Sequence, residues 1–120
     1  MRNLVAIPFL AILAVPSVGL AASPLSTAPL PFEPGEFVQC AVSNVGTKPV
    51  ELRIEIVRDV STPTIFTLTS EPGAISPVAA SWLSGSQAYC RVSGISKKNA
   101  RVRLCVLDGT GHCGPTVEGH

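Results

Sequence analysis

Apolar and charged residues alternate with a strict period of two along residues 50–56. The apolar positions are Val50, Leu52, Ile54 and Ile56, and the charged positions between them are Glu51, Arg53 and Glu55. Such alternation predicts a half-buried β-strand that turns its apolar side chains toward a core and its charges toward solvent.

The segment before this strand alternates in a similar way. Val38, Cys40 and Val42 share one parity, which places Cys40 on the inward face of a second strand. Residues 44–49, between the two segments, contain Asn, Gly and Pro, which are common in turns. Residues 37–59 are therefore predicted to be two strands joined as a hairpin.

The rest of the chain repeats this pattern of short strands and turns. Further strands are predicted at residues 64–69, 78–82, 88–92 and 102–106. The predicted core consists of Val38, Val42, Leu52, Ile54, Ile56, Val92, Val102, Leu104 and Val106. The predicted exposed residues are Glu51, Arg53, Glu55, Arg101 and Arg103. Because apolar residues nowhere recur at helical spacing, we expect an all-β, antiparallel sandwich.

The first 22 residues have the pattern of a secretory signal peptide. Arg2 precedes an apolar run over residues 4–15, and small residues follow, with cleavage predicted after Ala21 or Ala22. A retained apolar anchor is the alternative, but the run is short for a bilayer and prolines interrupt it. The mature chain is expected to be soluble, without a transmembrane segment, and secreted or periplasmic.

The mature chain divides into three parts by composition. Residues 23–36 are rich in proline, which lacks an N–H donor, and are predicted to be an extended arm, with an edge strand at its end as an alternative. Residues 37–108 contain the alternating segments and are predicted to be the β-sandwich domain. Residues 109–120 are rich in glycine and are predicted to be a C-terminal tail.

The four cysteines predict a disulfide framework in a secreted chain of this size. Of three pairings, we favour Cys40 with Cys90, which both point inward, and Cys105 with Cys113, across a short turn. A metal site formed by Cys105, His112 and Cys113 is the alternative, but it lacks the paired ligand spacings typical of zinc sites.

Inward cysteines on an early and a late strand resemble the immunoglobulin-like sandwich, in which such a bridge joins two sheets. The resemblance covers residues 37–108, but the strand 50–58 has no tryptophan, and Ala88 occupies the position of the corner tyrosine. The runs SNVGTKPVELRIEI, AYCRVSG and KKNARVRLCVLD are also similar to small secreted bacterial proteins of unknown function. These resemblances imply a fold and no catalytic or binding residue.

Candidate catalytic residues are sparse. Both histidines, His112 and His120, lie in the predicted tail, which is a poor place for a catalytic triad. Glu51 and Glu55 alternate with Arg53, as on a solvated strand face rather than in an acid-base pair. We therefore predict a non-catalytic protein without cofactor or metal.

Basic residues are unevenly distributed along the chain. The segment 72–107 contains no acid. Its bases are Arg91, Lys97, Lys98, Arg101 and Arg103. They predict either a basic surface patch for an anionic glycan, lipid headgroup or acidic extracellular protein, or cross-strand pairing with Glu51 and Glu55. The pairing requires the strand of Arg91 to border that of Arg101. Nucleic acid is not expected, since Tyr89 alone is a poor stacking platform.

Two functions from different classes follow from these features. The first is a non-catalytic secreted or periplasmic β-sandwich protein that serves as a binding or structural module. The second is a small disulfide-stapled inhibitor of a hydrolase, which would present a rigid exposed loop, with residues 94–99 as the best candidate. A small enzyme is a third hypothesis, without residues to support it.

Overall fold

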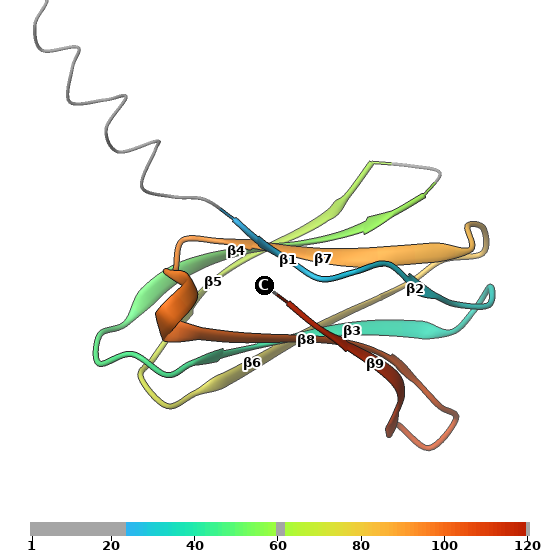
Figure 1. Cartoon of the computed structure of the whole chain (residues 1–120). Helices are drawn as coiled ribbons and strands as arrows, with labels where there is room; N and C mark the ends of the chain where they lie inside the picture. The colour runs from blue at the N-terminus through green and yellow to red at the C-terminus, as the bar shows by residue number, and fades with distance from the viewer. Residues whose placement is uncertain (1–23, 60–61, 120) are drawn as a thin grey trace, which may run out of the picture.

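A computed structural model describes residues 24–59 and 62–119 of the protein (Figure 1). Its strands are β1 (Leu25–Ser26), β2 (Leu30–Pro31), β3 (Phe37–Asn44), β4 (Val50–Arg58), β5 (Thr64–Ser70), β6 (Ile75–Ser81), β7 (Gln87–Ser93), β8 (Ala100–Leu107) and β9 (Cys113–Glu118), and a short 3-10 helix, η3, spans Lys97–Asn99. Within the described ranges, no helix is long and apolar enough to cross a membrane. The predicted signal peptide, residues 1–22, lies outside the described residues.

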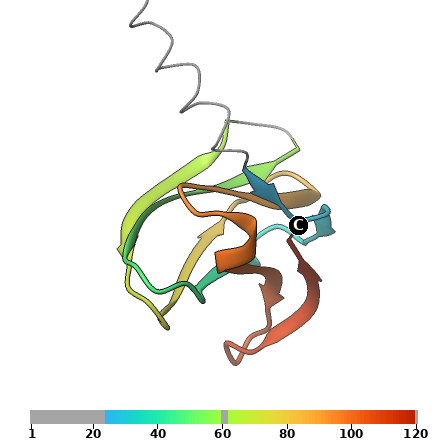
Figure 2. The same ribbon diagram turned by 60° about the vertical axis from the view of Figure 1, so that its left-hand side comes forward.

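The strands form two antiparallel sheets that lie one over the other (Figures 1 and 2). In the first sheet the strand order is β1-β7-β4-β5, and β2 also pairs with β7. In the second sheet the order is β6-β3-β8-β9. The all-β, antiparallel sandwich predicted from the alternating pattern is therefore confirmed.

Alternate side chains of both sheets fill the layer between them. Burial alternates along β3 residue by residue, because successive side chains of a strand point to opposite faces. All of the predicted core residues are buried: Val38, Val42, Leu52, Ile54, Ile56, Val92, Val102, Leu104 and Val106. Cys40 of β3 and Cys90 of β7 form a disulfide across this layer, with 6.2 Å between their Cα atoms. The bridge therefore joins the two sheets at the core.

One of the predicted exposed positions is wrong. Glu55 lies on the outer face of β4 but is only 9% exposed. Its carboxylate contacts Arg53 and Arg91, which flank it on β4 and on the neighbouring β7. The alternating pattern identifies the face on which Glu55 lies, but it contains no information on the adjacent strand that covers it.

Two predicted strand neighbours are also wrong. Residues 37–59 do not form a hairpin, because β3 pairs with β6 and β8 while β4 pairs with β5 and β7. The strand of Arg91, β7, does not border β8, because the connection over residues 94–99 crosses from the first sheet to the second. A period of two indicates which side chains share a face and leaves the partner strand undetermined.

Both ends of the described chain belong to the sheets. β1 and β2, in the predicted arm, pair with β7, and Leu25 and Leu30 are buried in the core. β9, in the predicted tail, pairs with β8. Thr27 and Gly119 form an isolated bridge, so the two ends meet at one side of the sandwich (Figure 1). The sandwich thus extends beyond the predicted boundaries at residues 37 and 108.

Candidate functional site

The residues of the predicted basic patch do not share one face. Arg91 is on β7 in the first sheet, whereas Arg101 and Arg103 are on β8 in the second. Lys97 and Lys98 lie in η3, in the connection between these strands. The structure therefore divides the predicted patch among two sheet faces and one end of the sandwich.

On the first sheet, the arginines are paired with Glu55. Arg91 Nη2 lies 2.6 Å from Glu55 Oε1, and Arg53 Nε lies 3.1 Å from Glu55 Oε2. Arg91 and Glu55 are opposite each other in the β4–β7 register. The hydrogen bond that Arg91 donates to Glu55, together with the negative charge of Glu55, raises the pKa of the Arg91 guanidinium. The positive charges of this face are thus partly neutralised by a neighbouring carboxylate.

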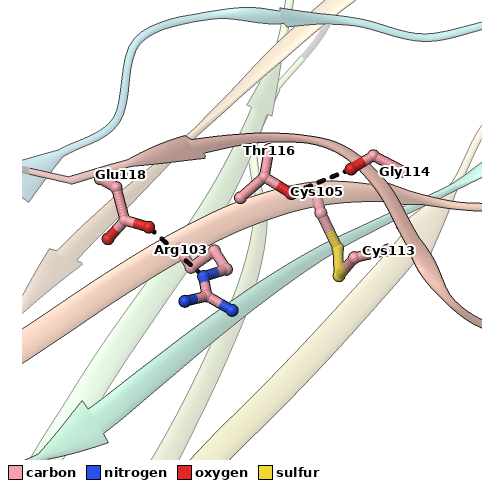
Figure 3. Close-up of polar contacts among 6 residues, drawn as sticks. All are labelled: Arg103, Cys105, Cys113, Gly114, Thr116 and Glu118. Atoms are coloured by element: carbon pink, nitrogen blue, oxygen red, sulfur yellow. Dashed lines mark hydrogen bonds and ion pairs between the residues drawn. A yellow bond between two sulfur atoms is a disulfide. The ribbon is translucent and has the colours of Figure 1, made fainter.

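Arg103 and Arg58 also have partners. Arg103 Nε on β8 lies 3.4 Å from Glu118 Oε2 on β9 (Figure 3). Arg58, at the end of β4, lies over the ring of Trp82 at 5.4 Å and donates a 3.0 Å hydrogen bond to the Ser84 carbonyl. Neither guanidinium is available as an isolated cation.

The remaining bases lie together at one end of the sandwich. We call this group the cationic end, and it consists of Lys48, Lys97, Lys98 and Arg101. All of its members are exposed, and within the described residues none of them forms an ion pair. Glu51 and Glu71 are the acids near this end, so its four positive charges exceed the negative charges around them.

Asn44 supports the turns that build the cationic end. Its side chain is 1% exposed, and Nδ2 donates hydrogen bonds to the carbonyls of Lys48 at 2.9 Å and Ser70 at 3.1 Å. Its Oδ1 accepts a 3.0 Å hydrogen bond from the Gly46 N–H. One buried amide therefore fixes the β3–β4 turn and attaches it to the end of β5.

The connection that carries Lys97 and Lys98 is anchored separately. Ile95 is 8% exposed and belongs to the core, and the Asn99 carbonyl accepts a 2.9 Å hydrogen bond from the Val45 N–H. Gly94 has φ +97°, and a Cβ there would overlap the Glu51 carbonyl oxygen. The β3–β4 turn, the β5–β6 turn and η3 consequently lie beside one another at the left of Figure 1.

A shallow hollow of about 250 Å³ lies between the β3–β4 turn and η3. Its lining residues are Asn44, Gly46, Thr47, Lys48, Val50 and Asn99. Four of these residues, Asn44, Thr47, Lys48 and Asn99, have polar side chains, and Lys48 is the charged one.

The predicted disulfide pairing is present. Cys105 is bonded to Cys113 (Figure 3), as Cys40 is to Cys90, and the described residues include no free cysteine. A disulfide-bonded cysteine has no thiolate to donate to a metal. The alternative metal site at Cys105, His112 and Cys113 therefore lacks two of its ligands in this structure.

Three polar residues meet in the β8–β9 turn. Asp108 Oδ1 accepts hydrogen bonds from the Thr110 hydroxyl at 2.7 Å, the Thr110 N–H at 2.8 Å and the His112 N–H at 3.0 Å. These bonds, above all that of the hydroxyl, lower the pKa of Asp108. His112 Nδ1 contacts Thr110 Oγ1 at 2.8 Å and not the carboxylate, so the arrangement differs from a catalytic triad. The three residues close an exposed turn.

Neither a protein-family model nor a curated protein matches the chain. Among solved structures, the fold is similar to the crystal structure of Thermotoga maritima 1070, with a TM-score of 0.51 and 15% sequence identity. The similarity covers 81% of this chain and 91% of that one. At this identity the likeness concerns the fold alone.

Asn44 and Lys48 belong to the candidate site, although their place in the sequence does not single them out. The spacing of Asn44 and Gly46 is that of an Asx turn, in which an Asn side chain accepts a hydrogen bond from the N–H two residues later. That spacing is the sequence signal that could have identified Asn44 as a residue that supports this turn. The bond from Asn44 to Ser70 joins residues 26 positions apart, and no local pattern predicts it.

Proposed function

We propose that the chain is a non-catalytic, secreted or periplasmic protein with an immunoglobulin-like sandwich, and that its cationic end binds an anionic glycan. One observation carries this proposal. The bases of the cationic end have no carboxylate partner among the described residues, whereas Arg53, Arg91 and Arg103 on the sheet faces do. Exposed cations without counter-charges produce a positive potential that attracts anionic ligands.

The rigid support of the cationic end favours the same function. The hydrogen bonds of the Asn44 side chain hold the β3–β4 turn in place. Ile95, which is buried, anchors the connection that carries Lys97 and Lys98. A binding surface whose backbone is already ordered loses less conformational entropy when it binds. Only the exposed lysine and arginine side chains need to become ordered around a ligand.

The compartment and the immunoglobulin-like type rest on separate support. The leader pattern of residues 1–22 and the two disulfides are typical of an exported protein. The bridge between facing sheets is a property of immunoglobulin-like domains. In this chain, however, β8 lies beside β3, and the N-terminal strands lie beside β7.

The hydrolase-inhibitor alternative has less support. Its candidate loop, residues 94–99, is a compact turn containing η3 and is anchored by Ile95. The N–H of Asn99 bonds to the Ser96 carbonyl at 2.9 Å, which closes the loop on itself. An inhibitor that occupies an enzyme cleft usually presents an extended segment, so we prefer the binding module.

The proposal can be tested by binding of the purified protein to an immobilised sulfated glycan such as heparin at increasing salt. The double variant Lys97→Gln/Lys98→Gln is expected to bind about threefold to tenfold more weakly, since each exposed ion pair contributes up to about 1 kcal/mol. Arg53→Gln/Arg103→Gln is the matched control, because it removes the same charge from the sheet faces.

The control variant should retain most of the binding if the cationic end is the site. Equal losses in both double variants would indicate attraction by net charge alone and would contradict a specific site. Absence of binding by the unmodified protein at low salt would refute the glycan proposal outright. Far-UV circular dichroism of each variant verifies that the fold is retained.

A further inference from the structure

Three of the four sheet edges have features that prevent pairing with another chain. β1 and β2 contain two residues each, and β2 ends in Pro31. β6 contains Pro77, and β9 contains Pro115 and has a register shift against β8. Short strands, prolines and bulges are the usual protections of exposed sheet edges.

The fourth edge, β5, has none of these features. Its sequence, TIFTLTS, has no proline, glycine or charged residue over seven positions. Among the described strands, β4 is its only partner. Every second N–H and C=O group of an edge strand points away from its partner, so β5 presents a row of backbone donors and acceptors.

The side chains of β5 are also incompletely covered. Phe66 and Leu68 pack against the core but are only partly buried. On the outer face, Ile65 is 47% exposed. A strand added beside β5 would cover apolar surface on both faces while it satisfied the backbone groups of the edge.

We propose that β5 pairs in antiparallel fashion with β5 of a second copy of the chain, about a two-fold axis at Thr67. In this register Phe66 faces the partner's Leu68 on the core side, and Ile65 faces the partner's Thr69 on the outer side. The two first sheets then form one continuous sheet through the dimer. An antiparallel pair with matching parity keeps core side chains together and outer side chains together.

A second copy fits this edge because β5 has similar chemistry on both sides of Thr67. Phe66 and Leu68 are apolar, and Ile65 and Thr69 are β-branched. A two-fold interface requires such self-complementarity, since each contact occurs twice. The absence of charge in β5 means that no like charges meet across the axis.

The oligomeric state of the purified protein and of two charge variants tests the inference. Thr67 is exposed on the outer face, so Thr67→Lys and Thr67→Glu leave the core unchanged. Each variant places two like charges opposite each other at the axis. The dissociation constant of the dimer should therefore rise at least about tenfold. An equimolar mixture of the two variants should regain the dimer, because opposite charges then meet. Sedimentation equilibrium measures all of these states.

Thr116→Lys is the matched control, since Thr116 is exposed on the edge strand β9 and should leave the dimer intact. A protein that stays monomeric at the highest soluble concentration would overturn the proposal. The edge of β5 would then be open to a strand of another protein. A dimer that Thr67→Lys leaves unchanged would overturn it as well. If one variant fails to fold, loss of the dimer in the other variant still decides the question.

Discussion

The centre of the sandwich and its C-terminal ribbon, formed by β8 and β9, use the same two kinds of contact in different surroundings. Each contains one disulfide and one glutamate that pairs with arginine. The central glutamate, Glu55, lies on the outer face of β4 and contacts two arginines, whereas Glu118 contacts one. In the centre, Cys40 and Cys90 are fully buried, and the Glu55 side chain is 12% exposed. In the ribbon, Cys105 is buried but its partner Cys113 is exposed, and the Glu118 side chain is 58% exposed (Figure 3).

The difference shows that a contact stabilises the fold according to its burial and to the chain segments it joins. The Cys40–Cys90 bridge spans 50 residues and connects both sheets, whereas the Cys105–Cys113 bridge spans 8 residues and closes one turn. Solvent screens the Arg103–Glu118 pair, while the Glu55 carboxylate is largely removed from water. Stability should therefore depend on the centre more than on the ribbon.

Removal of the two disulfides should produce the largest contrast. In the chain-entropy model, a disulfide that closes a longer loop stabilises the fold more. The central bridge contributes about 4 kcal/mol and the ribbon bridge about 2.5 kcal/mol. Cys40→Ala/Cys90→Ala also leaves unfilled volume in the core, which adds to the loss. We expect this variant to be unfolded or strongly destabilised, and Cys105→Ala/Cys113→Ala to remain folded.

Urea unfolding of the two variants measures this difference. The free energy is taken from the midpoint together with the slope, because loss of a disulfide also changes the compactness of the unfolded chain. Alanine is used in both variants so that no buried hydroxyl is introduced. A larger loss for the ribbon variant would contradict the view that β9 is peripheral to the stability of the sandwich.

The glutamates should produce the next contrast. Glu55→Gln removes the charge that Arg53 and Arg91 share and should lower the free energy of unfolding by about 1 kcal/mol. Glu118→Gln should change it by less than about 0.5 kcal/mol, because the Arg103 pair is exposed.

Glu51→Gln provides a control for loss of charge on the same face of β4, since Glu51 is exposed and has no ion pair among the described residues. It is expected to behave like Glu118→Gln. Equal effects of Glu55→Gln and Glu51→Gln on the free energy of unfolding would mean that the burial of Glu55 does not contribute to stability.

The smallest effect should be a local response of the β8–β9 turn to acid. Hydrogen bonds from Thr110 and His112 lower the pKa of Asp108 below its ordinary value of 3.8. A carboxyl group with a lowered pKa stabilises the fold above its unfolded pKa, and this contribution is lost as pH falls through the folded pKa. The turn should therefore be intact at neutral pH and loosen only in strong acid.

Amide chemical shifts of Thr110 and His112, followed by NMR from neutral to acid pH, measure this response. Asp108→Asn should abolish the transition that both amides show in strong acid. Asp59→Asn is the matched control, since Asp59 is also an exposed aspartate whose pKa is lowered, in its case by hydrogen bonds from Ser86, which precedes β7. Persistence of the transition in Asp108→Asn would assign it to a different group.

The alternating pattern of the sequence by itself determined six of the strands, β3 to β8, and the faces of their side chains. Every residue predicted for the core, from Val38 to Val106, is buried, and the inward position of Cys40 and Cys90 correctly predicted their bridge. These features are local, because the direction of a side chain depends on its own parity along the strand. The acid-free segment 72–107 likewise identified most bases of the cationic end.

Only the tertiary structure decided which strands are neighbours. It separated Arg91 from Arg101, placed β8 beside β3, buried Glu55 between two arginines and brought Lys48 close to η3. Each of these relationships joins segments distant in the sequence. The alternation along a strand does not predict these relationships, because the turns are anchored by long-range contacts such as that of Asn44 with Ser70. The faces of this protein are thus encoded strand by strand, whereas its candidate site depends on how the strands meet.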